Sequence, residues 1–243
     1  MRLVLGIQPV REALRAHGAA VSRVMIERAP SPTLQALARF ATDQGVEVQE
    51  VPRATLEALS GGTRHQGVAA HAPPLRFVSV EDVLAGPEAA LLVALDEIQD
   101  PQNFGAVVRS AVAVAGAAVM WPEHASAPLT PATFRASAGA IEHATLVRVG
   151  SLRSTLSKCA AAGATVVALD GHADVMIYDV DLSKPTVLVV GSEGTGIRKA
   201  VRQVATVTAR LPMTGTLDSL NASAATAIAL YEAVRQRRVK SKA

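Results

Sequence analysis

The fold is decided by residues 186–198, which read TVLVVGSEGTGIR. Residues 186–190 form an apolar run typical of a strand buried on both faces, as strands of parallel sheets are. Three glycines follow within six residues, and open α/β sheets bind ligands at the carboxyl ends of their strands. The stretch therefore predicts a parallel sheet with a ligand loop. The alternative is a tight turn that needs glycine only for a positive φ.

The glycine spacing excludes two common ligand loops. Gly191, Gly194 and Gly196 do not fit the Gly-x-Gly-x-x-Gly pattern of nicotinamide-binding folds, and no Gly-Lys-Ser/Thr follows as in nucleoside triphosphatases. A nucleotide-binding oxidoreductase is therefore disfavoured. Glu193 disfavours phosphate in the loop and suits a ligand with hydroxyls or a cationic centre.

Further apolar runs place this strand in a larger sheet. They lie at 91–95, 117–120 and 165–169, and helical segments at 103–115, 151–162 and 197–204 alternate with them. A last helix is expected from 219 to 238. This alternation predicts an α/β domain over residues 90–243, with a parallel sheet covered by helices on both sides.

The first 72 residues predict a separate small α/β domain. Strands are expected at 3–5, 24–26, 46–51 and 68–71, with helices between them that begin near Pro9, Ser31-Pro32 and Pro52. The tandem prolines at 73–74 cannot continue a helix interior or a central strand. We therefore expect a linker at 73–89.

Composition limits the class of protein. Apolar residues make up 49% of the 243 residues, which is typical of a globular chain. The single cysteine, Cys159, allows neither an internal disulfide nor a cysteine-based zinc site, and no metal is expected. No apolar run reaches the roughly 18 residues of a membrane span, and the start lacks a signal peptide, so we expect a cytoplasmic protein. The net charge of +3 is concentrated in basic ends, which suit a polyanion or an ordinary solvated surface.

Two other segments carry polar residues where a helix begins. In residues 100–109, Asn103 is expected to cap a helix that presents Gly105 and Arg109 on one face. In residues 211–225, Asp218 or Ser219 is expected to cap the last helix. Alone, these segments are equally explained by ordinary helix caps and a surface arginine.

Together the three segments resemble the signature motifs of the SpoU methyltransferases. The motifs are Asn-x-Gly-x-x-x-Arg at 103–109, Gly-Ser-Glu-Gly-x-Gly at 191–196, and Leu-Pro-Met-x-Gly-x-x-x-Ser-Leu-Asn-x-Ser at 211–223. The resemblance extends over residues 91–238. Residues 6–14 and 65–68 resemble the ribosomal-protein-like RNA-binding domain of the RlmB-type members.

The resemblance implies a fold and an activity. The fold is the SPOUT fold, in which the C-terminal segment is tied into a trefoil knot, and the assembly is a homodimer. The implied activity is methyl transfer from S-adenosylmethionine to a ribose 2′-hydroxyl, with a guanosine of 23S rRNA as the target. A tRNA methyltransferase of the same class and a non-catalytic RNA-binding protein are the alternatives.

The resemblance also implies which residues act. Arg109 lies at the 2′-hydroxyl; a guanidinium stays protonated, so we favour an electrostatic role over that of general base. The implied catalytic residues are Arg109, Asn103, Glu193, Ser219 and Asn221. The implied cofactor-binding residues are Gly171, Gly191, Leu211, Met213, Ser219, Leu220 and Ser223, and the expected RNA contacts are Arg11, His65 and Arg198. For His65, a structural role in the small domain is weighed equally.

Overall fold

The computed structural model describes residues 1–86, 88–124, 126–127, 129–215 and 219–241. They form two compact units. Unit 1 contains Met1–Arg76 and Leu129–His143, and unit 2 contains Phe77–Pro128 and Ala144–Ala243. The sequence places residues 129–143 in the second domain, whereas the structure groups them with unit 1.

Unit 1 is a four-stranded sheet in the order β1-β4-β2-β3. Apolar side chains of the strands lie on both faces of the sheet, and one face packs on α1 and α2 while the other packs on Leu56 of α3. Strand β4 is antiparallel to β1 and β2, and β2 is parallel to β3. The elements are β1 (Arg2–Leu5), α1 (Ile7–His17), η1 (Gly18–Ala20), β2 (Arg23–Glu27), α2 (Pro32–Asp43), β3 (Val48–Val51), α3 (Arg53–Ser60) and β4 (Val68–Ala72).

Residues 129–143 are held in unit 1 by a buried carboxylate. This segment forms α6 (Pro131–Ala136) and η3 (Ala140–His143). Glu142 accepts hydrogen bonds from the guanidinium of Arg2, and its Oε2 lies 2.9 Å from Nε2 of His17. The carboxylate is fully buried, so these partners compensate the cost of removing it from water.

Unit 2 is a seven-stranded parallel sheet in the order β7-β6-β5-β10-β8-β11-β9. Strands β5 and β10, buried along almost their whole length, are apolar runs predicted for a parallel sheet. The bounds are β5 (Leu91–Asp96), β6 (Ala118–Pro122), β7 (Leu146–Val149), β8 (Thr165–Leu169), β9 (Val175–Met176), β10 (Thr186–Gly191) and β11 (Val207–Arg210).

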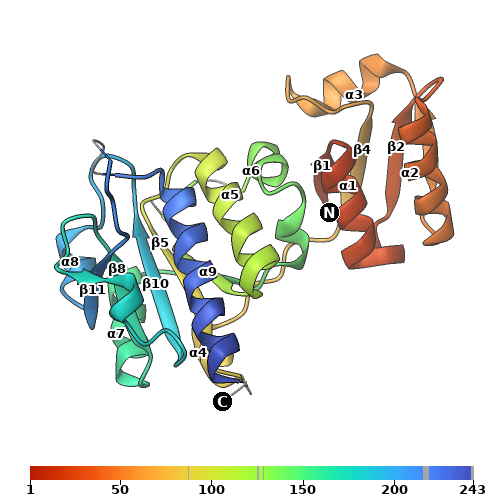
Figure 1. Cartoon of the computed structure of the whole chain (residues 1–243). Helices are drawn as coiled ribbons and strands as arrows, with labels where there is room; N and C mark the ends of the chain where they lie inside the picture. The colour runs from red at the N-terminus through yellow and green to blue at the C-terminus, as the bar shows by residue number, and fades with distance from the viewer. Residues whose placement is uncertain (87, 125, 128, 216–218, 242–243) are drawn as a thin grey trace. The chain divides into compact units, whose positions relative to one another are not determined.

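Helices cover both faces of this sheet, as predicted. α5 (Pro101–Ser110), extended by a π-helical turn η2 (Ala111–Ala115), lies beside α9 (Ala222–Lys240) (Figure 1). A second core joins the sheet to the remaining helices, with Val80, Leu156 and Val201 among its buried residues. Those helices are α4 (Val80–Leu84), α7 (Leu152–Ala161) and α8 (Lys199–Arg202); η4 (Ile177–Asp179) follows β9.

The expected linker contains a helix. Ser79 and Asp82 form a capping box that begins α4, and Val80 is buried in the core of unit 2. Residues 77–89 therefore belong to unit 2 rather than to a free connection. The trefoil knot stays a prediction. No helix among the described residues is long and apolar enough to cross a membrane.

Candidate active site

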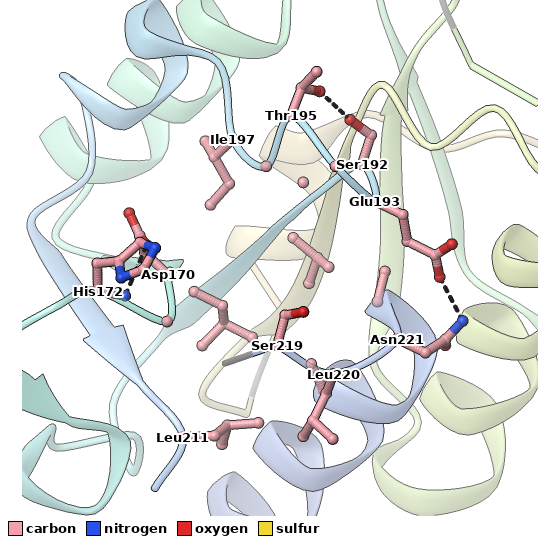
Figure 2. A pocket seen from close by; sticks show the side chains of 18 of the residues that line it. Asp170, His172, Ser192, Glu193, Thr195, Ile197, Leu211, Ser219, Leu220 and Asn221 are labelled. Carbon is pink, nitrogen blue, oxygen red and sulfur yellow. Dashed lines mark hydrogen bonds between the residues drawn. The ribbon is translucent and has the colours of Figure 1, made fainter. Parts of the chain in front are cut away.

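A pocket lies at the carboxyl edge of the sheet in unit 2. It is formed by the segments that follow β8, β10 and β11 and by the start of α9 (Figure 2). Its volume is about 860 Å³. The residues that line it include Asp170, Gly171, His172, Gly191, Glu193, Arg202, Leu211, Met213, Ser219, Leu220 and Asn221. Six of the seven predicted cofactor residues are therefore brought together here; the exception is Ser223.

The glycine loop is folded back on itself. Ser192 and Gly196 form an isolated bridge, and the Ser192 and Thr195 hydroxyl oxygens lie 2.6 Å apart. A Cβ on Gly191 would lie 2.1 Å from the carbonyl carbon of Gly196, so no side chain fits there. Gly194 and Gly196 have φ values of +94° and +65°. Glycine is thus required by close backbone approach at one position and by φ at the others.

Three predicted catalytic side chains form one hydrogen-bonded cluster. The Asn103 amide donates to Oε1 of Glu193 at 3.0 Å. The Asn221 amide donates to the same oxygen at 2.5 Å and to Oδ1 of Asn103 at 2.9 Å. The cluster joins α5, the glycine loop and the start of α9, and Glu193 and Asn221 also line the pocket (Figure 2). The Glu193 carboxylate is thereby held in one direction beside the pocket.

The predicted helix caps are wrong in both segments. Asp100, not Asn103, caps α5 by accepting from the amides of Gln102 and Asn103. This frees the Asn103 side chain for Glu193. Asn221 caps α9 by accepting from the amides of Ser223 and Ala224, so the helix begins at Ala222 and not at Ser219. Asp218 lies outside the described residues.

Ser219 and Ser223 differ in their relation to the pocket. Ser219 precedes the helix and lines the pocket. The Ser223 hydroxyl donates to Oδ1 of Asn221 at 2.6 Å, which supports the cap rather than the pocket. The expectation that Ser223 contacts a cofactor is not supported by this geometry.

Arg109 is exposed on α5 and does not line the pocket of its own chain. It forms no ion pair or hydrogen bond with another side chain among the described residues. The guanidinium is thus available to an external anionic group. Gly105 is buried on the same helix.

The expected RNA contacts differ in their surroundings. Arg198 pairs with Asp96 at 2.6 Å and with Glu97 at 3.1 Å, and its side chain is still 43% exposed, so its guanidinium faces two carboxylates as well as solvent. His65 is only 6% exposed, and its Nδ1 accepts from the Gly67 amide at 3.1 Å. Both residues thus have structural partners within the chain, and their contact with RNA stays a prediction. Arg11 is half-buried on α1.

The pocket contains polar residues that sequence reasoning missed. Asp170 pairs with Arg202 at 2.6 Å, and both line the pocket with His172. The Asp170 carboxylate also accepts from the His172 amide at 3.0 Å, which fixes the turn after β8. The signal for Asp170 in the sequence was its position directly after a predicted strand. Its pairing with Arg202 was not visible, because Arg202 lies in α8, far along the chain.

The fold and the pocket define an α/β enzyme that binds a small ligand at the carboxyl edge of a parallel sheet. The model of the SpoU rRNA Methylase family matches residues 90–231, and a model described as RNA 2′-O ribose methyltransferase substrate binding matches residues 3–78. The chain therefore belongs to the SpoU rRNA methylase family.

Relatives and solved structures agree with this assignment. The chain is 41% identical to an uncharacterized tRNA/rRNA methyltransferase of Mycolicibacterium smegmatis, over 97% of this chain and 77% of that protein. The SpoU methyltransferase AviRb of Streptomyces viridochromogenes, in complex with AdoMet, has a TM-score of 0.77 and 29% identity over 98% of this chain and 90% of its own. The AdoMet-bound rRNA methyltransferase of Sinorhizobium meliloti has a TM-score of 0.78 and 27% identity, over 96% and 86%.

Proposed function

We propose that this chain transfers a methyl group from S-adenosylmethionine to the 2′-hydroxyl of a guanosine ribose in 23S rRNA. The observation that carries the proposal is the cluster of Asn103, Glu193 and Asn221 beside the pocket, in a chain that matches both SpoU family models. Membership of the family makes it an RNA methyltransferase; the nucleotide and the 23S molecule are the proposal.

The pocket fits S-adenosylmethionine in size and chemistry. Ligand pockets of about 300–1,000 Å³ are usual for molecules of this size, and this one has about 860 Å³. Leu220 and Met213 are 41% and 38% exposed, which is apolar surface available to an adenine ring. Glycine backbone and the Glu193 carboxylate suit hydroxyls and a cationic centre. When bound, the cofactor supplies an electrophilic methyl group on a sulfonium.

The residues that would hold the cofactor are those of the pocket wall. Main-chain groups of Gly191, Leu211 and Leu220 would contact the adenine and ribose, with Gly171, Met213 and Ser219 beside them. Glu193 is oriented by Asn103 and Asn221, so its carboxylate holds one direction without reorganising.

Arg109 acts on the RNA in this proposal. Its guanidinium binds the phosphate next to the reacting ribose and stabilises the alkoxide that develops as the hydroxyl loses its proton. The exposure of Arg109 on α5 supports this role.

We also infer a homodimer that brings Arg109 to the partner's pocket. Ile228, Tyr231 and Val239 on α9 are 41%, 65% and 59% exposed, which leaves apolar surface on the face of α9 turned away from its own core. Ala113 and Val114 of η2 line a groove with Tyr231. Arg109 lies one turn before Ala113 on the same helix, so a second copy covering this groove would lie next to Arg109.

Unit 1 supports an RNA substrate, because residues 3–78 match a model described as RNA 2′-O ribose methyltransferase substrate binding. The name tRNA/rRNA methyltransferase of the M. smegmatis relative leaves tRNA as the second candidate. The test incubates the protein and labelled S-adenosylmethionine with 23S rRNA from cells that lack the activity, and with tRNA in parallel. Label in 23S rRNA alone is expected; label in tRNA alone would replace the proposed substrate.

A further inference from the structure

Asp96 is a fully buried carboxylate at the end of β5, outside the set of catalytic residues implied by the motifs. Its Oδ2 accepts from the backbone amide of Arg198 at 2.8 Å, and its Oδ1 accepts from Nε of Arg198 at 2.8 Å. A second guanidinium nitrogen lies 2.6 Å from Oδ1. A buried charge with this many donors is held in one orientation.

The pair closes the glycine loop at its base. Asp96 is the register partner of Gly191, where the loop leaves β10, and Arg198 is the residue with which the loop enters α8. Asp96 therefore connects the first residue of the loop, Gly191, to its last residue, Arg198. The segment between them presents Glu193, and the loop's own contacts, such as the Ser192–Thr195 bond, lie within the closed turn.

The same carboxylate stands at the start of a second active-site segment. After Asp96 the chain continues through Glu97, whose φ of +59° lies in the left-handed region. It then reaches Asp100, which caps α5. Asn103 follows in the first turn of α5 and donates to Glu193. Glu97 also faces Arg198 at 3.1 Å. One ion-paired junction thus sets the separation of the two segments that meet at the Asn103–Glu193 hydrogen bond.

We propose that Asp96 and Arg198 are a positioning pair for methyl transfer: they hold the glycine loop and the start of α5 at the spacing that cofactor binding and the Asn103–Glu193–Asn221 cluster require. The inference rests on the proposed function of the pocket. Arg198 then acts through the loop and not on RNA phosphate.

Three variants separate these roles. Arg198→Met removes the guanidinium and leaves Asp96 with the backbone amide alone. Asp96→Asn keeps the shape of the side chain but replaces one carboxylate oxygen with an NH2 group. Both oxygens of Asp96 accept from Arg198, so in the variant at least one donor of Arg198 loses its acceptor. Arg198→Lys keeps the charge and the backbone bond without the planar fork, so it serves as the milder variant if the others fold poorly. Lys199→Met is the control, since Lys199 is the exposed neighbour of Arg198.

The experiment measures S-adenosylmethionine binding by calorimetry, kcat and KM for RNA at several salt concentrations, and amide hydrogen exchange of residues 191–198. For Arg198→Met and Asp96→Asn we expect roughly 10- to 100-fold weaker cofactor binding, lower kcat and faster exchange in the loop. The KM for RNA and its salt dependence should match those of wild type. Arg198→Lys should be intermediate, and Lys199→Met should bind cofactor normally.

Two outcomes would overturn the proposal. A raised KM for RNA in Arg198→Met, with a salt slope reduced by about one and unchanged cofactor binding, would assign Arg198 to a phosphate. A lower thermal midpoint with unchanged binding, kcat and loop exchange would reduce the pair to a stabilising contact. Absence of cofactor binding by the wild-type protein would instead reject the proposed function, while the exchange data would still test the pair.

Discussion

Arg109 is the residue on which the chemical step is expected to depend most. Arg109→Ala should lower kcat by at least about 100-fold and leave S-adenosylmethionine affinity nearly unchanged, because the guanidinium acts on the RNA phosphate and the developing alkoxide and not on the cofactor. Arg109→Lys should also be poor, since a point charge does not replace a planar fork. Steady-state kinetics and calorimetry check both; near-normal turnover of the lysine variant would contradict the bidentate role.

Gly191 is expected to tolerate no side chain. In Gly191→Ala the new Cβ would meet the Gly196 carbonyl carbon at 2.1 Å, so the loop must open. We expect at least about tenfold weaker cofactor binding. Gly150→Ala is the matched control, because a Cβ at Gly150 has nothing within 4 Å. Equal cofactor affinity of the two variants in calorimetry would show that the folded-back loop is not part of the binding site.

The sequence predicted residues that belong to a motif, but it did not predict contacts made by a partner far away in the chain. Asn103, Glu193 and Asn221 follow from motif resemblance, and the structure brings them together. Arg198 was expected to contact RNA, yet it pairs with Asp96, which is 102 residues away. No local pattern reveals that pairing. The burial of His65, by contrast, fits the structural role that was weighed equally with an RNA contact, and its partner Gly67 is local.

At the scale of elements, Arg237 fastens the last helix to the amino-terminal side of the sheet. Its guanidinium donates to the carbonyls of Ala90 at 3.1 Å, Leu182 at 3.1 Å and Lys184 at 2.9 Å, and to Ala89 at 2.5 Å. Arg237→Met should lower the free energy of unfolding by about 2–3 kcal/mol, since charged hydrogen bonds are lost together. Urea denaturation measures this, with the exposed Arg153→Met as control. Equal unfolding midpoints for the two variants would refute the fastening role.

Elements with a strong period were predictable, and short ones were not. The runs that became β5, β8 and β10 are continuous apolar segments, which only a strand buried on both faces requires. β9 was missed because it has only two residues, and β11 was missed because two of its four residues are polar. α4 was missed because tandem prolines and a short helix together read as a linker.

The whole molecule is expected to be a homodimer in solution. Its exposed apolar residues on α9 include Tyr231 at 65% exposure, on a helix whose inner face is already buried. Tyr231→Glu should shift the light-scattering mass toward the monomer and lower methyl transfer, because Arg109 would lose the partner's pocket. A wild-type monomer with full activity would contradict the shared site.

The division of the chain into units could be predicted only in part. The proline-rich boundary near residue 73 was visible in the sequence, and unit 1 does include Met1–Arg76. That residues 129–143 group with unit 1 was not visible, because the cause is the ion pairing of Glu142 with Arg2, 140 residues away.

The most direct test of the account is the chemical position of the methyl group. RNA labelled by this protein from S-adenosylmethionine is hydrolysed in alkali, which cleaves RNA only where the 2′-hydroxyl is free. The account predicts that the label remains in an alkali-resistant dinucleotide whose methylated member is guanosine. Label released in mononucleotides would place the methyl group on a base and contradict the account.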